Sequence, residues 1–187
     1  LRAPAAPNLD YLARYPFGTC ELGGGMQVTY HRRPLVDPRD AAVMALCKLG
    51  SGANLLGYYM YHGGTHPLGE LSTQQESQAT GYWNDLPVRN YDFQAPLGED
   101  GQVREHYHRL RFIHLFLQDF GSQLASMPAV LPAGQPTGLD DAQTPRWAVR
   151  SDGEQGYLFI NNYQRIEALP MQRGIQFELG LKTGRLR

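Results

Sequence analysis

The chain has 187 residues, enough for one sizeable hydrophobic core or for one core with a small appendage. Its 17 basic and 18 acidic side chains are interspersed and leave a net charge of −1, so we expect neither a nucleic acid nor a membrane surface as a partner. No apolar run is long enough for a membrane span. The two cysteines, Cys20 and Cys47, are predicted to be free, partly buried thiols, with a single disulfide between them as the alternative.

The first predicted elements are a short strand and a helix. Residues 15–22 (YPFGTCEL) form an apolar run that ends close to a single carboxylate. The next element, residues 37–50, has the signals of a helix at both ends. Asp37 can cap its N-terminus, Pro38 suits the first helical position, and Gly50 suits a left-handed stop.

The middle of the chain predicts a second strand, a long loop and a long helix. Residues 53–61 (ANLLGYYMY) have no charge and no alternation, which indicates a strand buried on both faces and therefore in a parallel sheet. Residues 62–101 show neither period, and a loop of this length in a compact domain is typically functional. Residues 101–127 repeat apolar side chains at helical spacing.

The last third of the chain predicts a linker followed by strands. Pro128 and the Pro/Gly-rich residues after it indicate the linker. Residues 146–165 predict a β-hairpin that turns at Asp152 and Gly153, and residues 174–179 predict a further strand.

His62, His66 and Glu70 have the four-residue spacing of a metal site on a helix. The glycines that follow His62, together with Pro67, prevent that helix, and in a loop the spacing loses its meaning. We therefore predict no metal and no cofactor, with the two histidines as polar lining or turn residues.

Polar or glycine-rich segments follow both predicted strands. In α/β proteins the loops that leave the carboxyl ends of parallel strands build the active site. On that logic Glu21 and the segment Tyr59–Thr65 line one pocket. The glycines Gly23–Gly25 would let the backbone approach a ligand closely.

Two segments resemble motifs of the β-galactosidases of glycoside hydrolase family 35. Residues 58–66 (YYMYHGGTH) resemble the Tyr-Met-Tyr/Phe-x-Gly-Gly-Thr-Asn segment of that family, and residues 90–101 (NYDFQAPLGEDG) resemble its Ser-Tyr-Asp-Tyr-Asp-Ala-Pro-Leu segment. The resemblance covers about residues 15–127. The chain departs from the family pattern at three single positions: His66 in place of Asn, Phe93 in place of Tyr and Gln94 in place of Asp. After the nucleophilic Glu, which corresponds to Glu21, many members have an aromatic residue and Gly-Trp, whereas this chain reads ELGGGMQ from Glu21 onward.

The resemblance implies an α/β fold, the C-terminal portion of a (β/α)8 TIM barrel, followed by a β-rich segment. By position, residues 15–22 and 53–61 are the seventh and eighth barrel strands, and Glu21 is the nucleophile. Tyr59 matches a sugar-contacting tyrosine, and Phe93 keeps the ring of another without its hydroxyl. The remaining candidate substrate-binding residues are Tyr91 and His62, and the implied substrate is a β-galactoside oligosaccharide or polysaccharide.

The resemblance also predicts that this chain is incomplete. A full barrel needs about 250 residues, and the Asn-Glu pair that holds the family's acid/base is absent from the sequence. We expect barrel over residues 1–132, a linker over 133–145 and the start of a β-rich domain over 146–187. The acid/base would lie outside the chain, which alone would be inactive.

Other carboxylates and aromatics in the long loop have more ordinary interpretations. Rim, turn or capping roles are predicted for the carboxylates Glu70, Asp85, Asp92 and Glu99. Two aromatic residues, Tyr82 and Trp83, either stack on a sugar or pin the loop.

Two further functional classes stay open at this point. One is a catalytically inactive, glycosidase-like carbohydrate-binding module. The other is a phosphate or nucleotide binder that uses Gly23–Gly25, although its helix would have to begin directly after the glycines rather than at Pro38.

Overall fold

Two parallel strands form the first layer of the protein, whose computed structural model describes residues 14–28, 33–68, 70 and 89–186. Strand β1 (Phe17–Leu22) pairs in parallel with β2 (Ala53–Tyr58), which confirms the predicted parallel pair. The helix α2 (Pro38–Gly50) connects them, as a parallel crossover requires. The predicted cap is confirmed, because the Asp37 carboxylate accepts a hydrogen bond from the Arg39 N–H at 2.8 Å.

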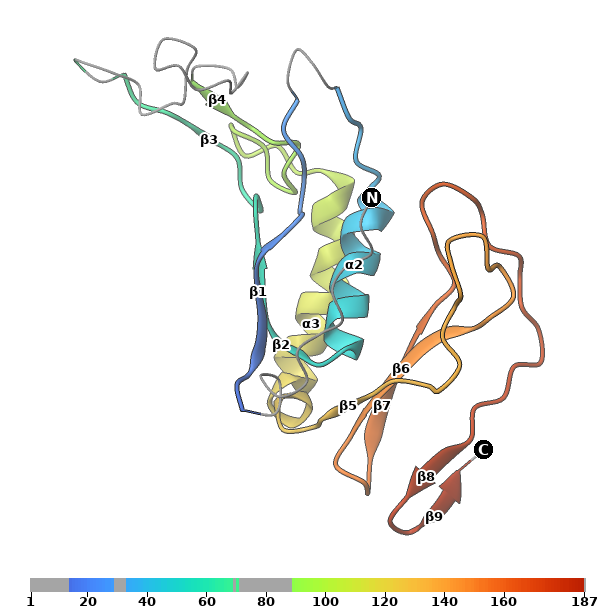
Figure 1. The fold of residues 1–187 in the computed structure, drawn as a ribbon. Coiled ribbons are helices and arrows are strands. Elements are labelled where there is room, and N and C mark those ends of the chain that lie inside the picture. Colours follow the sequence, from blue (N-terminus) through green and yellow to red (C-terminus); the bar gives the residue numbers. More distant parts are fainter. Residues whose placement is uncertain (1–13, 29–32, 69, 71–88, 187) are drawn as a thin grey trace.

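Helices α2 and α3 (Glu105–Ala125) lie side by side and form the second layer (Figure 1). Helix α3 confirms the long predicted helix but begins at Glu105. The helices meet the strands in an apolar core around Leu22, Ala45 and Leu110, against which Leu56 and Tyr58 also pack.

The third layer lies on the other side of the helices (Figure 1). It is an antiparallel sheet in the order β5–β6–β7, formed by β5 (Ala129–Val130), β6 (Arg146–Ser151) and β7 (Gly156–Asn161). The β6–β7 pair confirms the predicted hairpin. It packs on the helices through a second core of Leu49, Leu124 and Phe159.

Two short strand pairs and one predicted strand differ from the sequence predictions. The pair β3 (Gly64–Thr65) and β4 (Asn90–Tyr91) lies in the predicted loop, and β8 (Leu179–Leu181) pairs with β9 (Gly184–Leu186) at the end of the chain. The strand predicted at 174–179 is wrong for all but its last residue. The backbone at Gly174 is left-handed, with φ of 65°, and the chain becomes a strand only at Leu179.

Strand β2 is not buried on both faces, so that prediction is also wrong. Leu56 and Tyr58 pack toward the helices, but Leu55 on the opposite face is 59% exposed. The reason is that helices cover only one face of the β1–β2 pair in the described part of the chain. We call the other side the open face.

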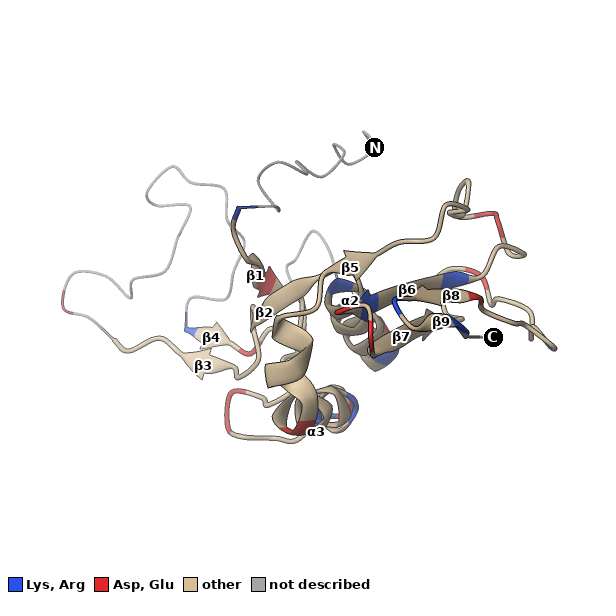
Figure 2. Cartoon of the chain, turned by 90° about the horizontal axis from the view of Figure 1, so that it is seen from below, with Lys and Arg blue, Asp and Glu red and all other residues tan. Residues whose placement is uncertain are grey.

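Charged residues are interspersed over the described chain (Figure 2). Cys20 and Cys47 are free thiols, but both are exposed rather than partly buried. None of the helices in the described ranges is long and apolar enough to cross a membrane.

The Arg150 side chain joins all three layers. It is 1% exposed, and burial lowers its pKa. Its guanidinium donates to carbonyl oxygens at the C-terminal ends of both helices and at the start of β2. The acceptors are Leu49 O at 3.4 Å, Leu124 O at 2.7 Å, Met127 O at 3.0 Å, Ala53 O at 3.0 Å and Asn54 Oδ1 at 2.6 Å. The last carbonyls of a helix lack partners within the helix and carry partial negative charge, which a buried cation satisfies.

Replacing Arg150 should therefore be costly. We expect Arg150→Met to lower the free energy of unfolding by about 3 kcal/mol or more, because several buried carbonyls lose their donor. The measurement is urea unfolding followed by circular dichroism. Arg185→Met is the matched control, since Arg185 forms an ion pair with Glu178 at the surface and its loss should change stability little. Equal effects of the two substitutions would contradict the role given to Arg150.

Candidate active site

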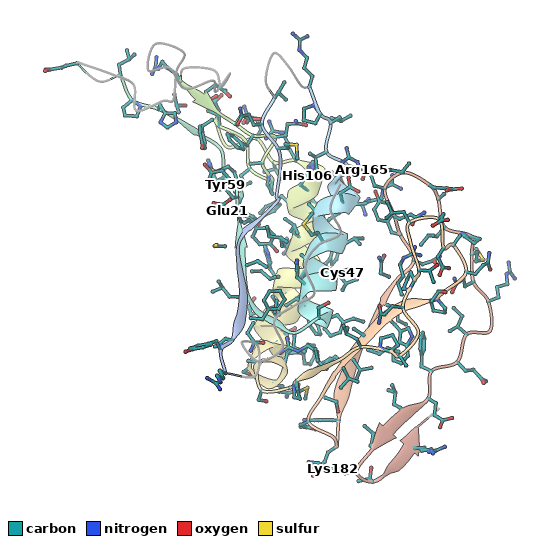
Figure 3. All side chains as sticks on the ribbon, in the orientation of Figure 1. Glu21, Cys47, Tyr59, His106, Arg165 and Lys182 are labelled. Atoms are coloured by element: carbon teal, nitrogen blue, oxygen red, sulfur yellow. The ribbon has the colours of Figure 1, made fainter. Side chains whose placement is uncertain are left out.

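The carboxyl ends of β1 and β2 lie next to each other, and Glu21 and Tyr59 stand there. The Tyr59 N–H donates to Leu22 O at 2.9 Å, which joins the two strand ends. Leu22 and Tyr58 pack toward the helices, so their neighbours Glu21 and Tyr59 point to the open face. Figure 3 shows both side chains at these strand ends, on the side away from the helices. The Glu21 side chain is exposed.

Tyr59 stands beside Glu21 (Figure 3) and forms, with Tyr91 and Phe93, what we call the aromatic wall. The hydroxyls of Tyr59 and Tyr91 are hydrogen-bonded to each other. The Phe93 ring centroid lies 5.6 Å from that of Tyr59 and 4.4 Å from that of Tyr91. His66 packs edge-on against Tyr91 at 4.9 Å. The structure therefore brings three of the four predicted binding residues together.

His62, the fourth, does not join the wall in any contact of the described residues. It is exposed, its Nδ1 lies against Gly63 O, and its backbone bridges Leu97. The segment that follows it contains β3 rather than a helix, as the glycines predicted. In the described ranges no three potential ligands gather where a metal ion could bind.

Asp92 organises the loop that holds Tyr91 and Phe93. Its carboxylate accepts hydrogen bonds from the Arg104 guanidinium at 2.9 Å and from the backbone N–H groups of Glu99 at 2.8 Å and Gln94 at 3.1 Å. Partial burial acts to raise the pKa of Asp92, but the Glu99 N–H and the Arg104 guanidinium outweigh it, and the pKa lies below its usual value. Asp92 is thus a structural carboxylate.

Phe93 and Gln94 have left-handed backbones, with φ of 56° and 52°. This conformation is uncommon for residues other than glycine and clusters at functional sites. The Gln94 amide holds it in place by donating to Met26 O at 3.0 Å and Pro34 O at 2.8 Å. Those acceptors lie in and beyond the glycine-rich loop that follows Glu21.

The glycines in that loop approach protein backbone rather than a ligand, which corrects the sequence interpretation. A Cβ on Gly25 would overlap the carbonyl oxygens of Phe93 and Gln94, and one on Gly24 would overlap Met60 O. Both glycines are buried. A phosphate site at Gly23–Gly25 is therefore contradicted, because the helix begins only at Pro38 and the glycines are packed against other backbone.

The other carboxylates of the segment have structural partners or lie elsewhere. Glu99 accepts hydrogen bonds from Thr65 and Asn90 and so braces the β3–β4 pair. Glu70 is exposed. The predictions for Asp85, Tyr82 and Trp83 fall outside the described residues. Glu21 is thus the carboxylate that stands exposed beside the aromatic wall.

Sequence reasoning missed Arg104 and Gln94 as residues that shape the site. Arg104 stands at the N-cap of α3, and no sequence motif pointed to it. Gln94 was recognised only as a departure from a family motif. The Asp92–Arg104 spacing gives no local signal, because the pair meets only when the loop closes.

We expect the ion pair of Asp92 to contribute stability that depends on pH. Because the native pKa is lowered, the contribution is complete above the unfolded value of about 4 and is lost as the pH falls through the native pKa. Asp92→Asn should cost about 2 kcal/mol at neutral pH. Thermal unfolding of both proteins as a function of pH should show the difference in Tm shrinking below about pH 4.

The control for this experiment is Asp119→Asn, an exposed carboxylate on α3. It should leave Tm nearly unchanged at every pH. A constant difference between Asp92→Asn and the parent down to strongly acidic pH would contradict the ionic role.

A comparison with protein families places this site in context. The sequence profile described as "Glycosyl hydrolases family 35" matches residues 8–116, which is more than half of the chain and includes β1, β2 and the aromatic wall. No curated protein matches the chain. The profile begins earlier and ends earlier than the expected resemblance over 15–127. The chain belongs to glycosyl hydrolase family 35, so the matched residues are part of a glycoside hydrolase.

Proposed function

We propose that the protein is a retaining β-galactosidase in which Glu21 is the nucleophile. The observation that supports this most directly is the exposed Glu21 at the carboxyl end of a parallel strand, with Tyr59 at the end of the next strand. Active sites of (β/α)8 barrels are built at this edge from the ends of neighbouring strands.

The proposed reaction needs two carboxyl groups about 5–5.5 Å apart. Glu21 attacks the anomeric carbon, the bond to the leaving oxygen breaks, and a second carboxylic acid gives that oxygen its proton. The same group, now a carboxylate, then takes a proton from water while the water oxygen attacks the anomeric carbon. The bond between the sugar and Glu21 breaks, and the sugar leaves with retained configuration.

The second carboxyl group is proposed to lie outside this chain. Within the described residues, the loop carboxylates Asp92 and Glu99 are already engaged by Arg104 and by Thr65 and Asn90. We further propose that β1 and β2 are the seventh and eighth barrel strands and that this chain alone is inactive. Barrel, linker and β-rich domain would be divided at 133–145, a segment where the described chain has neither helix nor strand.

The aromatic wall is proposed to bind the terminal galactose of an oligosaccharide or polysaccharide. Sugar rings present C–H groups that pack on aromatic faces, and the Tyr59–Tyr91 hydroxyl pair offers a donor and an acceptor at the edge. Phe93 adds a face without a hydroxyl. His62 would line the outer rim of the sugar-binding site, because its side chain is exposed and it follows Tyr59 closely in the sequence.

The test of the nucleophile uses the full-length enzyme and an aryl β-galactoside. Glu21→Gln should lower kcat by about a thousandfold or more, because the amide cannot form the glycosyl-enzyme. Glu21→Gly with added azide should form α-galactosyl azide, which identifies the missing group as the nucleophile. Glu105→Gln on α3 is the control and should keep the parent rate.

Each other result has a distinct meaning. Substantial activity of Glu21→Gln would refute the assignment of the nucleophile. A parent protein that binds galactose in calorimetry but hydrolyses no galactoside would favour the inactive carbohydrate-binding module.

The aromatic wall can be tested separately. Tyr91→Phe keeps the ring but removes the hydroxyl that pairs with Tyr59, and should reduce kcat/KM about tenfold. Tyr107→Phe on α3 is the control. Equal kcat/KM for both variants and the parent would remove the hydroxyl pair from the binding site.

A further inference from the structure

We propose that Gly57 is a positioning residue for Glu21: it makes room for an extra residue in β1 that allows Glu21 to point to the open face. This inference rests on the proposed function, since it concerns the orientation of the proposed nucleophile. Four observations support it, from the strand register, the exposure pattern, the core contacts and the space around Gly57.

The first is the register of the parallel pair. Thr19 lies opposite Leu56, and Leu22 lies opposite Tyr58. Between these two levels β1 advances by three residues while β2 advances by two, and the register is irregular there. Strand β1 therefore contains one extra residue between Thr19 and Leu22, as in a β-bulge, while a separate shift of opposite sense lies between Phe17 and Gly18, where β2 has the extra residue. Bulges frequently re-aim a side chain next to an active site.

The second and third observations show which way the side chains point. A regular strand alternates between its two faces. Here Cys20 and Glu21 are both exposed, although they are consecutive, while Leu22 is buried in the core with Leu110. With Thr19 at the level of Leu56, strict alternation would turn Glu21 toward the helices and Leu22 away from them. With the extra residue in β1, Glu21 points to the open face and Leu22 points toward the helices.

The fourth observation is the lack of space at Gly57, which lies on β2 between the two paired levels. A Cβ there would lie 2.9 Å from Thr19 O, 3.0 Å from Cys20 Cα and 3.0 Å from Cys20 O. All three are backbone atoms of the bulge, so no side-chain rotation can relieve the contact. Only glycine at position 57 lets the bulge rest on β2, and any side chain must displace the backbone that precedes Glu21.

The direct test measures which face residues 21 and 22 occupy, without using activity. In the full-length enzyme with every native cysteine replaced by serine, Cys20 and Cys47 among them, a single thiol is introduced by Glu21→Cys or by Leu22→Cys. Methyl methanethiosulfonate should modify the thiol at position 21 at least about a hundred times faster than the thiol at position 22. Adding Gly57→Ala should reduce this ratio to below about ten.

The second readout is catalytic. Gly57→Ala alone should lower kcat about a hundredfold, because the nucleophile is displaced, while the inhibition constant of galactose changes little. Gly180→Ala is the matched control. Gly180 also lies in a strand, and an added Cβ there meets nothing within 4 Å, so both the thiol ratio and kcat should stay at parent values.

A third variant covers the case in which Gly57→Ala does not fold. Deleting Cys20 removes the extra residue and makes the pair regular from Gly18 to Leu22, with room for a Cβ at position 57. Gly57→Ala should then leave Tm nearly unchanged in the deletion protein. The proposal would be overturned if Gly57→Ala lowered the Tm of the deletion protein as much as it lowers the Tm of the parent protein. It would also be overturned if the deletion protein folded with glycine but not with alanine at position 57.

The outcomes separate this inference from the proposed function. An unchanged thiol ratio after Gly57→Ala, with kcat at the parent value, overturns the role of Gly57 and leaves Glu21 as the nucleophile. Full activity of Glu21→Gln refutes the proposed function, and the thiol ratio still decides whether Gly57 sets the face of residue 21.

Discussion

The buried guanidinium of Arg150 holds the three layers of this protein together. It comes from the hairpin layer, passes between the ends of α2 and α3, and reaches the first residues of β2. Its acceptors are carbonyl and amide oxygens rather than carboxylates, so its charge is balanced by the partial negative ends of two helices. These hydrogen bonds fix the first residues of β2, and the strand then runs directly to Tyr59 at its other end.

At the other end of the strands, side-chain hydrogen bonds and close backbone contacts hold the loops that carry the aromatic wall. Gln94 and Gly25 fasten the loop after Glu21 to the left-handed turn at Phe93, and Arg104 fastens that turn to the start of α3. Two of the departures from the family motifs, Gln94 and the ELGGGMQ segment, contact each other through the hydrogen bond from the Gln94 side chain to Met26 O. An aspartate side chain at position 94 has no N–H group and could not donate this hydrogen bond.

The features that local signals determine could be predicted from sequence. The Asp37 cap and the β6–β7 hairpin each depend on residues close together in the chain. The residues that shape the site could not, because Gln94 meets Pro34 and Arg150 meets Ala53 across long stretches of chain. The strand predicted at 174–179 failed for a related reason: its residues have strand propensity, but a strand needs a partner, and pairing begins only at Leu179.

The position of Arg150 late in the chain has a consequence for biosynthesis. The ribosome completes α2, β2 and α3 before it adds the residue whose side chain satisfies their terminal carbonyls. Until the hairpin emerges, those helix ends are hydrated and free to fray. The helix ends are therefore completed only after translation has reached β6, and truncation of the chain within 133–145 removes the residue that completes them.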